Sequence, residues 1–151
     1  MIAEETGQVL PEQEAYLYLI RAAEVVSGPI VDLFTEKRLS GKQYNVLRSI
    51  RRAGESGATV NEIRLQMTDP RADVTRLIDR LVRDGLVRRK SDRSDRRLVR
   101  VVLSGKGQGL LKEIDEPLLA VHKSQFVRFT PDELEQLKTL LKQIIATRQG
   151  A

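Results

Sequence analysis

In the middle of the chain, the spacing of apolar side chains changes from that of a helix to that of a strand. Over positions 74–82 they recur every three or four residues, which places them on one helix face. Gly85 ends this pattern, and two β-rich runs follow at 86–91 and 98–103, joined by a polar loop at 92–97. The segment therefore predicts an amphipathic helix followed by an antiparallel hairpin. The helix stripe comprises Val74, Leu77, Ile78, Leu81 and Val82, and the second strand places Val99, Val101 and Leu103 on one face.

Capping residues predict where the other helices begin. In the segments Ser40–Gln43, Thr59–Glu62 and Thr130–Glu133, a serine or threonine stands three residues before a glutamine or glutamate. Such pairs satisfy free backbone amides at a helix start. Asp69-Pro70 offers the amphipathic helix a capping aspartate and a proline at its first position, and Ser104 caps a long helix after the hairpin.

Long helices are expected on both sides of this central region. The first covers 11–38, where Gly28-Pro29 predicts a kink or a break because proline lacks an amide proton and crowds the preceding turn. Pro117 predicts a kink in the helix that starts at Ser104. The last helix has the spacing of a helix–helix seam, through Leu134, Leu137, Leu141 and Ile144. We therefore expect a mainly α fold of one domain, residues 1–151, with a small antiparallel β-hairpin.

Positive charge is concentrated in one fifth of the chain. The formal net charge is +5, and residues 71–100 hold eleven basic and five acidic side chains, whereas the remainder is nearly neutral. One interpretation is a solvated surface with ordinary salt bridges, such as Asp79 with Arg83. The other is a polyanion-binding surface, because each neutralised phosphate releases counterions and adds affinity.

Composition argues against several classes of protein. The chain has no cysteine, one histidine (His122) and no tryptophan, which disfavours thiol chemistry, a metal site and base-stacking platforms. Its longest uncharged run is seven residues, too short to span a bilayer, and its start lacks a signal-peptide pattern. We find no catalytic constellation. The expectation is a cytoplasmic binding protein rather than an enzyme, with no metal, cofactor or membrane partner.

A short helix, a turn and a second helix with one polar face are typical of a helix-turn-helix. An α-helix fits the major groove of DNA, and its N-terminal residues reach base edges. Arg71, Asp73, Thr75 and Arg76 are therefore the candidate readers, whereas Arg80 and Arg83 are expected to meet phosphate or solvent. The hairpin loop is either a solvated turn or a wing that lies over the minor groove with Arg93, Arg96 and Arg97. Asp95 could hold Arg97 in position by pairing with it. A winged-helix module that docks an acidic protein remains an alternative.

The stretch from about Leu39 to Gly107 resembles the MarR (multiple-antibiotic-resistance regulator) family of winged helix-turn-helix regulators. The resemblance is carried by ordered motifs: Leu39-Ser40 with Gln43–Leu47, Asp73–Leu81, Gly85–Arg89, Asp95–Arg97, and Leu103-Ser104 with Gly107. It implies a transcriptional repressor that binds a pseudo-palindromic DNA operator as a homodimer. Residues 40–103 would form the DNA-binding lobe, and 11–39 with 104–148 the dimerisation helices. It further implies that Thr75 and Arg76 lie on the recognition helix, that Arg97 is the wing-tip arginine, and that a pocket accepts a small aromatic or phenolic effector.

Overall fold

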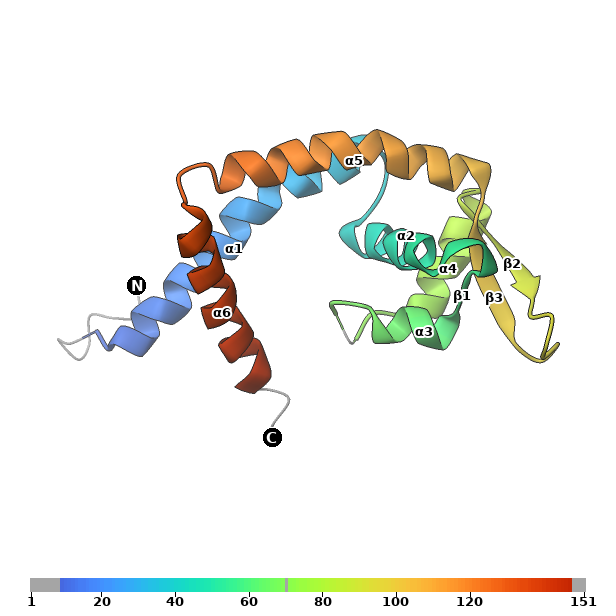
Figure 1. Cartoon of the computed structure of the whole chain (residues 1–151), viewed down its shortest axis with the longest axis horizontal. Coiled ribbons are helices and arrows are strands. Elements are labelled where there is room, and N and C mark those ends of the chain that lie inside the picture. Colours follow the sequence, from blue (N-terminus) through green and yellow to red (C-terminus); the bar gives the residue numbers. More distant parts are fainter. Residues whose placement is uncertain (1–8, 70, 148–151) are drawn as a thin grey trace.

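The computed structural model describes residues 9–69 and 71–147, and it is mainly helical with one small antiparallel sheet, as predicted. In chain order the elements are α1 (Pro11–Glu36), α2 (Gly41–Ala53), the 3-10 turn η1 (Gly54–Ser56), β1 (Ala58–Thr59), α3 (Val60–Leu65), α4 (Val74–Arg83), β2 (Val87–Ser91), β3 (Val99–Leu103), α5 (Gly105–Gln125) and α6 (Pro131–Thr147). Helices α1 and α5 run side by side along the long axis, and α6 turns back from the far end of α5 (Figure 1). The segment from α2 to β3 forms a lobe beneath the other end of α5.

The predicted capping boxes are confirmed. The Ser40 hydroxyl accepts from the Gln43 amide at 3.1 Å, Thr59 accepts from Glu62 at 3.2 Å, and Thr130 accepts from Glu133 at 3.2 Å. In each box the glutamine or glutamate side chain in turn accepts from the backbone amide of the capping residue. The second box opens a helix that ends at Leu65. Local side-chain chemistry is thus sufficient to fix these three starts.

The predicted cap of α4 is wrong. Instead of capping the helix, Asp69 closes a tight turn: its carboxylate accepts from the Arg71 amide at 2.9 Å, and its carbonyl accepts from Ala72 at 3.1 Å. An aspartate can bond its own nearby backbone in this way in competition with a helix. The helix starts at Val74 instead, with the Asp73 carboxylate accepting from the Arg76 amide at 3.1 Å. Pro70, the predicted first residue, lies outside the described residues.

Both internal prolines are accommodated within continuous helices. Helix α1 passes through Pro29 and α5 passes through Pro117, so the predicted alternative of a break at Gly28-Pro29 is wrong. Both prolines are exposed, which leaves backbone groups near them open to water. In addition, the Gln125 side chain of α5 donates to the Val26 carbonyl at 2.5 Å, in the turn that precedes Pro29. The carbonyl that loses its helical partner at Pro29 is that of Val25, and water can bind it because Val25 is exposed.

The sheet has three strands in the order β1-β3-β2, all antiparallel. The predicted hairpin is confirmed, and its register pairs Val87 with Leu103 and Ser91 with Val99. Strand β1 was not predicted, because two residues are too short to show an alternating pattern; it pairs Ala58 with Val101 on the other edge of β3. The central strand β3 is therefore held on both sides, which fixes the base of the hairpin against the rest of the lobe.

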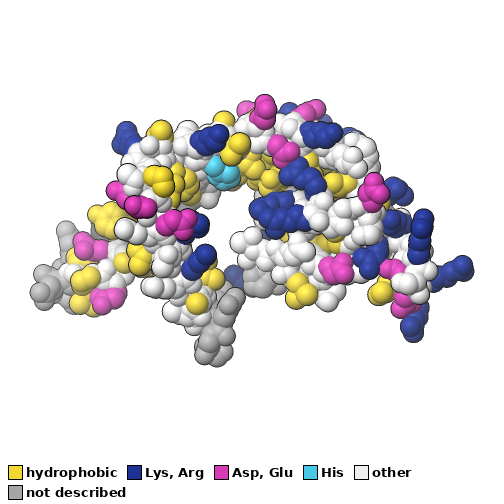
Figure 2. All heavy atoms as spheres, viewed as in Figure 1, with side chains coloured by type: hydrophobic (Ala, Val, Ile, Leu, Met, Phe, Trp, Pro, Cys, Tyr) yellow, Lys and Arg dark blue, Asp and Glu magenta, His cyan; other side chains and the backbone are white. Residues whose placement is uncertain are grey.

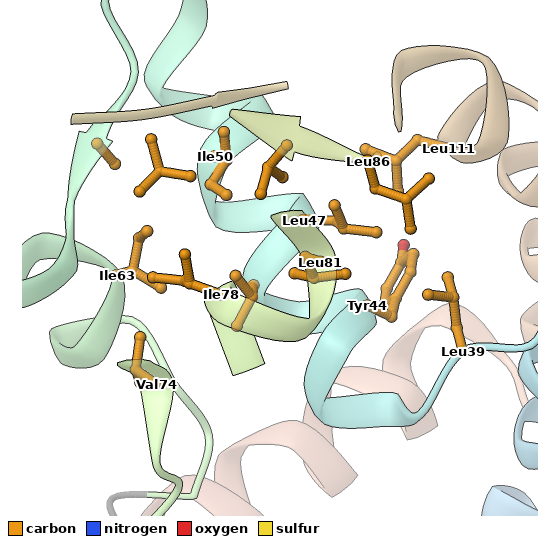
Figure 3. Packing of buried hydrophobic residues seen from close by; sticks show 14 of the residues in the cluster. Leu39, Tyr44, Leu47, Ile50, Ile63, Val74, Ile78, Leu81, Leu86 and Leu111 are labelled. Atoms are coloured by element: carbon orange, nitrogen blue, oxygen red, sulfur yellow. The ribbon is translucent and has the colours of Figure 1, made fainter. Parts of the chain in front are cut away.

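The apolar stripe of α4 faces the core, as predicted. Val74, Ile78 and Leu81 are buried, and Leu77 and Val82 pack against the same cluster. Figure 3 shows Val74, Ile78 and Leu81 in one cluster with side chains of α2, α3 and α5. The buried residues of α2, α3 and α5 in this cluster include Leu47, Ile50, Ile63, Leu111 and Ile114. Because Leu111 and Ile114 belong to α5, the core continues from the lobe into the long helix.

The start of α5 lies close to Leu86, the residue just before β2, and this close approach yields a stability prediction. A Cβ at Gly107 would lie 2.1 Å from the Leu86 carbonyl oxygen, which is itself bonded to the Ser104 amide, whereas a Cβ at Gly109 meets nothing within 4 Å. We expect Gly107→Ala to lower the free energy of unfolding by about 1–3 kcal/mol through overpacking. Gly109→Ala should raise it by about 0.5–1 kcal/mol through helix propensity. Urea denaturation at one fixed protein concentration measures both, and equal effects of the two substitutions would contradict the close approach.

The position of the α4 cap yields a second prediction. Asp73→Ala should cost about 1 kcal/mol of unfolding free energy because the Arg76 amide loses its acceptor. Asp73→Asn is the matched control, since asparagine caps about as well as aspartate, and it should leave the free energy nearly unchanged. Thermal or urea unfolding separates the two variants. If Asp73→Ala proves harmless, α4 does not begin at Val74.

Candidate nucleic-acid interface

The polar face of α4 points away from the core. Thr75, Arg76, Arg80 and Arg83 are exposed, and the last three line a shallow depression together with Asp79. Among residues 9–69 and 71–147, neither Arg80 nor Arg83 forms a salt bridge. The predicted orientation of these side chains is therefore confirmed, and their positive charges are available to a ligand.

Two predicted reader residues lie in other places than expected. Arg71 belongs to the turn before α4, where its side chain is 87% exposed and its Nε lies 3.9 Å from Asp69 Oδ1. Asp73 is the helix cap, so its carboxylate is already engaged with the Arg76 amide. The reason is the later helix start described above, which moves both residues off the first turn. Their placement on the helix was wrong, while their contact with DNA remains a prediction.

Asp69 anchors the turn that carries Arg71. Its pKa is lowered below the usual value, first by the hydrogen bond from the Arg71 amide and then by the side chain of Lys42. Lys42 Nζ of α2 lies 3.3 Å from Asp69 Oδ2. The turn is thus tied to the start of α2, which positions Arg71 beside the N-terminus of α4.

The salt bridge between Asp79 and Arg83, which the sequence suggested on the surface of α4, is wrong. The Asp79 carboxylate accepts from Arg89 of β2 instead. Strand β2 follows α4 closely in the chain, and residue 89 on the core-facing side of the strand reaches back over the helix. This ion pair fixes the polar face of α4 relative to the hairpin.

The loop at residues 92–97, called the wing loop from here on, carries the predicted cations. The Arg97 side chain is 92% exposed, and Arg93 and Arg96 are also exposed. Asp95 accepts from Arg97 Nε at 3.1 Å, from Nη2 at 3.4 Å and from the Arg97 amide at 3.0 Å. The predicted pairing of Asp95 with Arg97 is confirmed. Lys and Arg side chains gather around this end of the molecule, as Figure 2 shows.

The sequence did not identify a role for Asp92 and Arg100, which lie at the base of the wing loop and bind each other. Asp92 is only 8% exposed, and its carboxylate accepts from Ser94, Asp95 and Arg100. Hydrogen bonds from Ser94 and from the Arg100 side chain hold the pKa of Asp92 well below its usual range. The available signal was the Asp-x-Ser sequence, typical of an Asx turn. Its pairing with a cation eight residues later depends on the hairpin register, which the spacing alone does not specify.

Within the described ranges, no helix combines the length and apolar character needed to cross a membrane.

Comparison with known proteins places this geometry in a family. Residues 39–98 match the model described as MarR family. The MarR transcription factor from Planctomyces limnophilus is 36% identical, and the match covers 90% of this chain and 98% of that one with a TM-score of 0.66. The homoprotocatechuate degradative operon repressor of Escherichia coli is 23% identical over 128 residues, 85% of either chain.

A solved complex provides a further likeness in fold. A mutant of Escherichia coli MarR, crystallised with operator DNA, superposes with a TM-score of 0.75 at 24% identity, covering 87% of this chain and 93% of that one. Together with the 36% identical relative, which is matched over nearly its whole length, these findings decide the family. The chain belongs to the MarR family of DNA-binding transcriptional regulators.

Proposed function

We propose that this protein is a repressor that binds a pseudo-palindromic operator as a homodimer. The observation that carries the proposal is the pair of cationic surfaces on one lobe: the outward face of α4 and the wing loop. An α-helix fits the major groove, and arginines on a neighbouring loop fit the negative potential of the minor groove. The ion pair between Asp79 and Arg89 holds these two surfaces in a fixed relation.

The residues divide into readers and anchors by their positions. Thr75 and Arg76 stand in the first turn of α4 and are assigned to base edges, while Arg80 and Arg71 are assigned to phosphates on either side. Phosphate contacts set the register of a protein on the duplex, whereas base contacts select the sequence. In the wing loop, Arg97 is assigned to the minor groove, with Arg93 and Arg96 beside the backbone.

The assignment to repression draws on the relatives. The homoprotocatechuate degradative operon protein of Escherichia coli is named as a repressor, and it matches 85% of this chain. A compact DNA-binding lobe fits a protein that acts by occupying its operator. In this proposal residues 40–103 form that lobe, and residues 11–39 and 104–148 form the dimerisation helices.

Apolar side chains on α1 and α6 support a homodimer. Tyr16, Leu17, Leu140 and Ile145 are each more than half exposed, although they lie on long amphipathic helices. Exposed apolar surface of this extent marks an interaction site. A second copy of the chain would cover it through a two-fold axis and would present two α4 helices to the two halves of a palindrome.

A groove between the lobe and the long helices supports an effector site. It has a volume of about 600 Å³ and is lined by apolar, basic and acidic side chains, and Lys37 in it is paired with Glu113: Leu86, Leu110, Lys37, Arg38, Lys106, Asp84 and Glu113. This mixed lining suits a small aromatic or phenolic compound with polar substituents. A ligand that binds the DNA-incompetent dimer about 100-fold more tightly shifts the equilibrium by about 2.7 kcal/mol, enough to release an operator at moderate occupancy.

Selection of bound duplexes from a random pool tests the proposed function. A homodimer with two α4 helices should recover an inverted repeat whose half-sites are about one helical turn apart. Binding should weaken steeply with salt, because phosphate contacts release counterions. Recovery of no common sequence would overturn the proposal and favour the alternative, a module that docks an acidic protein.

The same selection with Thr75→Ala and Arg76→Ala assigns the readers. These variants should lose base preference at defined positions of the repeat, whereas Arg80→Ala should weaken all sequences about equally. A uniform loss in all three variants would show that α4 contacts only the DNA backbone.

Truncation of Arg97 tests the minor-groove contact. Arg97→Ala should weaken operator binding by about 1–3 kcal/mol, the cost of losing a groove contact. Arg128→Ala is the matched control, since it removes an equal charge from an exposed residue in the turn between α5 and α6, far from the lobe. Fluorescence anisotropy at several salt concentrations measures both, and equal effects would reject the wing assignment.

A further inference from the structure

The wing loop is organised around one buried carboxylate. Asp92 Oδ1 accepts from the Ser94 amide at 2.7 Å, from the Ser94 hydroxyl at 2.6 Å and from the Asp95 amide at 3.1 Å. Its other oxygen, Oδ2, accepts from Arg100 Nε. Both oxygens are thus occupied, and the first half of the loop is bent around the side chain of its first residue.

Arg100 connects this carboxylate to the helix-turn-helix. Its Nη1 donates to the Gly57 carbonyl at 3.3 Å and lies 3.7 Å from Glu62 Oε2. The same Glu62 oxygen accepts from the Thr59 amide at the start of α3. A continuous set of contacts therefore runs from the wing loop through Asp92 and Arg100 to the cap of α3, and it joins two parts of the lobe that are more than 30 residues apart in sequence.

The second half of the loop depends on the first. Asp95, whose amide is held by Asp92, uses its own carboxylate to hold the amide and the guanidinium of Arg97. The Leu98 amide then donates to the Asp95 carbonyl at 3.0 Å, and the backbone amide of Asp92 donates to the Leu98 carbonyl at 3.0 Å, which closes the loop. Arg97 is thus the exposed end of a chain of contacts whose buried origin is Asp92.

We propose that Asp92, held by Arg100, is a positioning residue that orders the wing loop in the free protein so that Arg97 meets its groove already in place. This inference rests on the proposed function, since it concerns how the lobe binds DNA. A loop that is ordered before binding loses less conformational entropy when the complex forms. Four cations lie at or beside this loop: Arg93, Arg96, Arg97 and Arg100. In the absence of the buried carboxylate, their mutual repulsion would favour a more open loop.

The proposal is testable because removal of the Asp92 charge has opposite expected effects on DNA binding with and without a positioning role. Asp92→Asn removes a negative charge from a DNA-binding surface, which by long-range electrostatics alone would strengthen binding. The positioning role predicts the opposite, because asparagine has a single acceptor oxygen and cannot accept from Ser94 and Asp95 on one atom and from Arg100 on the other. Asp84→Asn is the matched control: it removes the same charge from an exposed residue whose side chain has no hydrogen bond or salt bridge within the described residues.

Operator affinity is measured for five proteins: the wild type, the Asp92→Asn, Asp84→Asn and Arg97→Ala variants, and the double variant with Asp92→Asn and Arg97→Ala. Asp92→Asn should weaken binding by about tenfold through lost charged hydrogen bonds and lost order, whereas Asp84→Asn should leave it unchanged or slightly tighter. In an Arg97→Ala background, Asp92→Asn should cost almost nothing more, because the residue it positions is absent. The inference would be overturned if the fold-loss of operator affinity in the double variant equalled the product of the two single fold-losses. It would also be overturned if Asp92→Asn bound the operator as tightly as Asp84→Asn.

Backbone order parameters of residues 93–97 in the DNA-free protein provide a second measurement. Asp92→Asn should lower them while those of α4 remain unchanged. If Asp92→Asn does not fold, as judged by thermal unfolding, Arg100→Lys replaces it, since lysine keeps the charge but cannot hold Asp92 and Gly57 together. Failure of the wild type to bind any duplex would overturn the proposed function, and the inference with it. An unchanged loop in a protein that does bind DNA would overturn the inference alone.

Discussion

Burial of the apolar stripe of α4 is the constraint on which the rest of the structure depends. Val74, Ile78 and Leu81 are almost fully buried, and each buried side chain of this size contributes about 1.5–3 kcal/mol relative to exposure. No other rotation of the helix about its axis would bury them. The same packing therefore decides that Thr75, Arg76, Arg80 and Arg83 face outward. Packing of the core thus sets the direction in which the cationic face of α4 points. No interaction of the arginines themselves is needed to set it.

Placing so many cations on one lobe creates a cost that the acidic residues offset. Asp79, Asp92 and Asp95 each engage an arginine, yet they differ in what they hold. Asp79 holds the strand to the helix, Asp95 holds an exposed guanidinium, and Asp92 holds the loop itself. The pairs of Asp79 and Asp95 are exposed and contribute about 0–1 kcal/mol each, so their value lies less in stability than in geometry. The interspersed aspartates convert a region of like charge into a surface of defined shape.

The elements that could be predicted from the sequence are those fixed by local chemistry. The stripe at 74–82, the capping boxes and the hairpin all follow from residues within one or two turns of one another. Where two local signals competed, prediction failed: Asp69 and Asp73 are both good caps, and only the structure shows that Asp69 is used in a turn. The contacts of Asp92 with Arg100, and of Arg100 with Gly57 and Glu62, depend on strand register and on the short strand β1. No periodicity in the sequence encodes them.

The link between lobe and long helices bears on how a signal could reach the DNA in the proposed mechanism. Leu111 and Ile114 of α5 lie in the core of the lobe, and Arg51 of α2 contacts both oxygens of Asp115 at 3.0 and 2.9 Å. Lys37, at the end of α1, pairs with Glu113 of α5 at 2.9 Å. The lobe is therefore packed onto the first half of α5 as one body. In a dimer built on α1, α5 and α6, the separation of the two α4 helices would be set by how the long helices cross. An effector in the groove beside Lys37 and Lys106 would then act by changing that crossing, since packed cores switch between discrete arrangements and deform little.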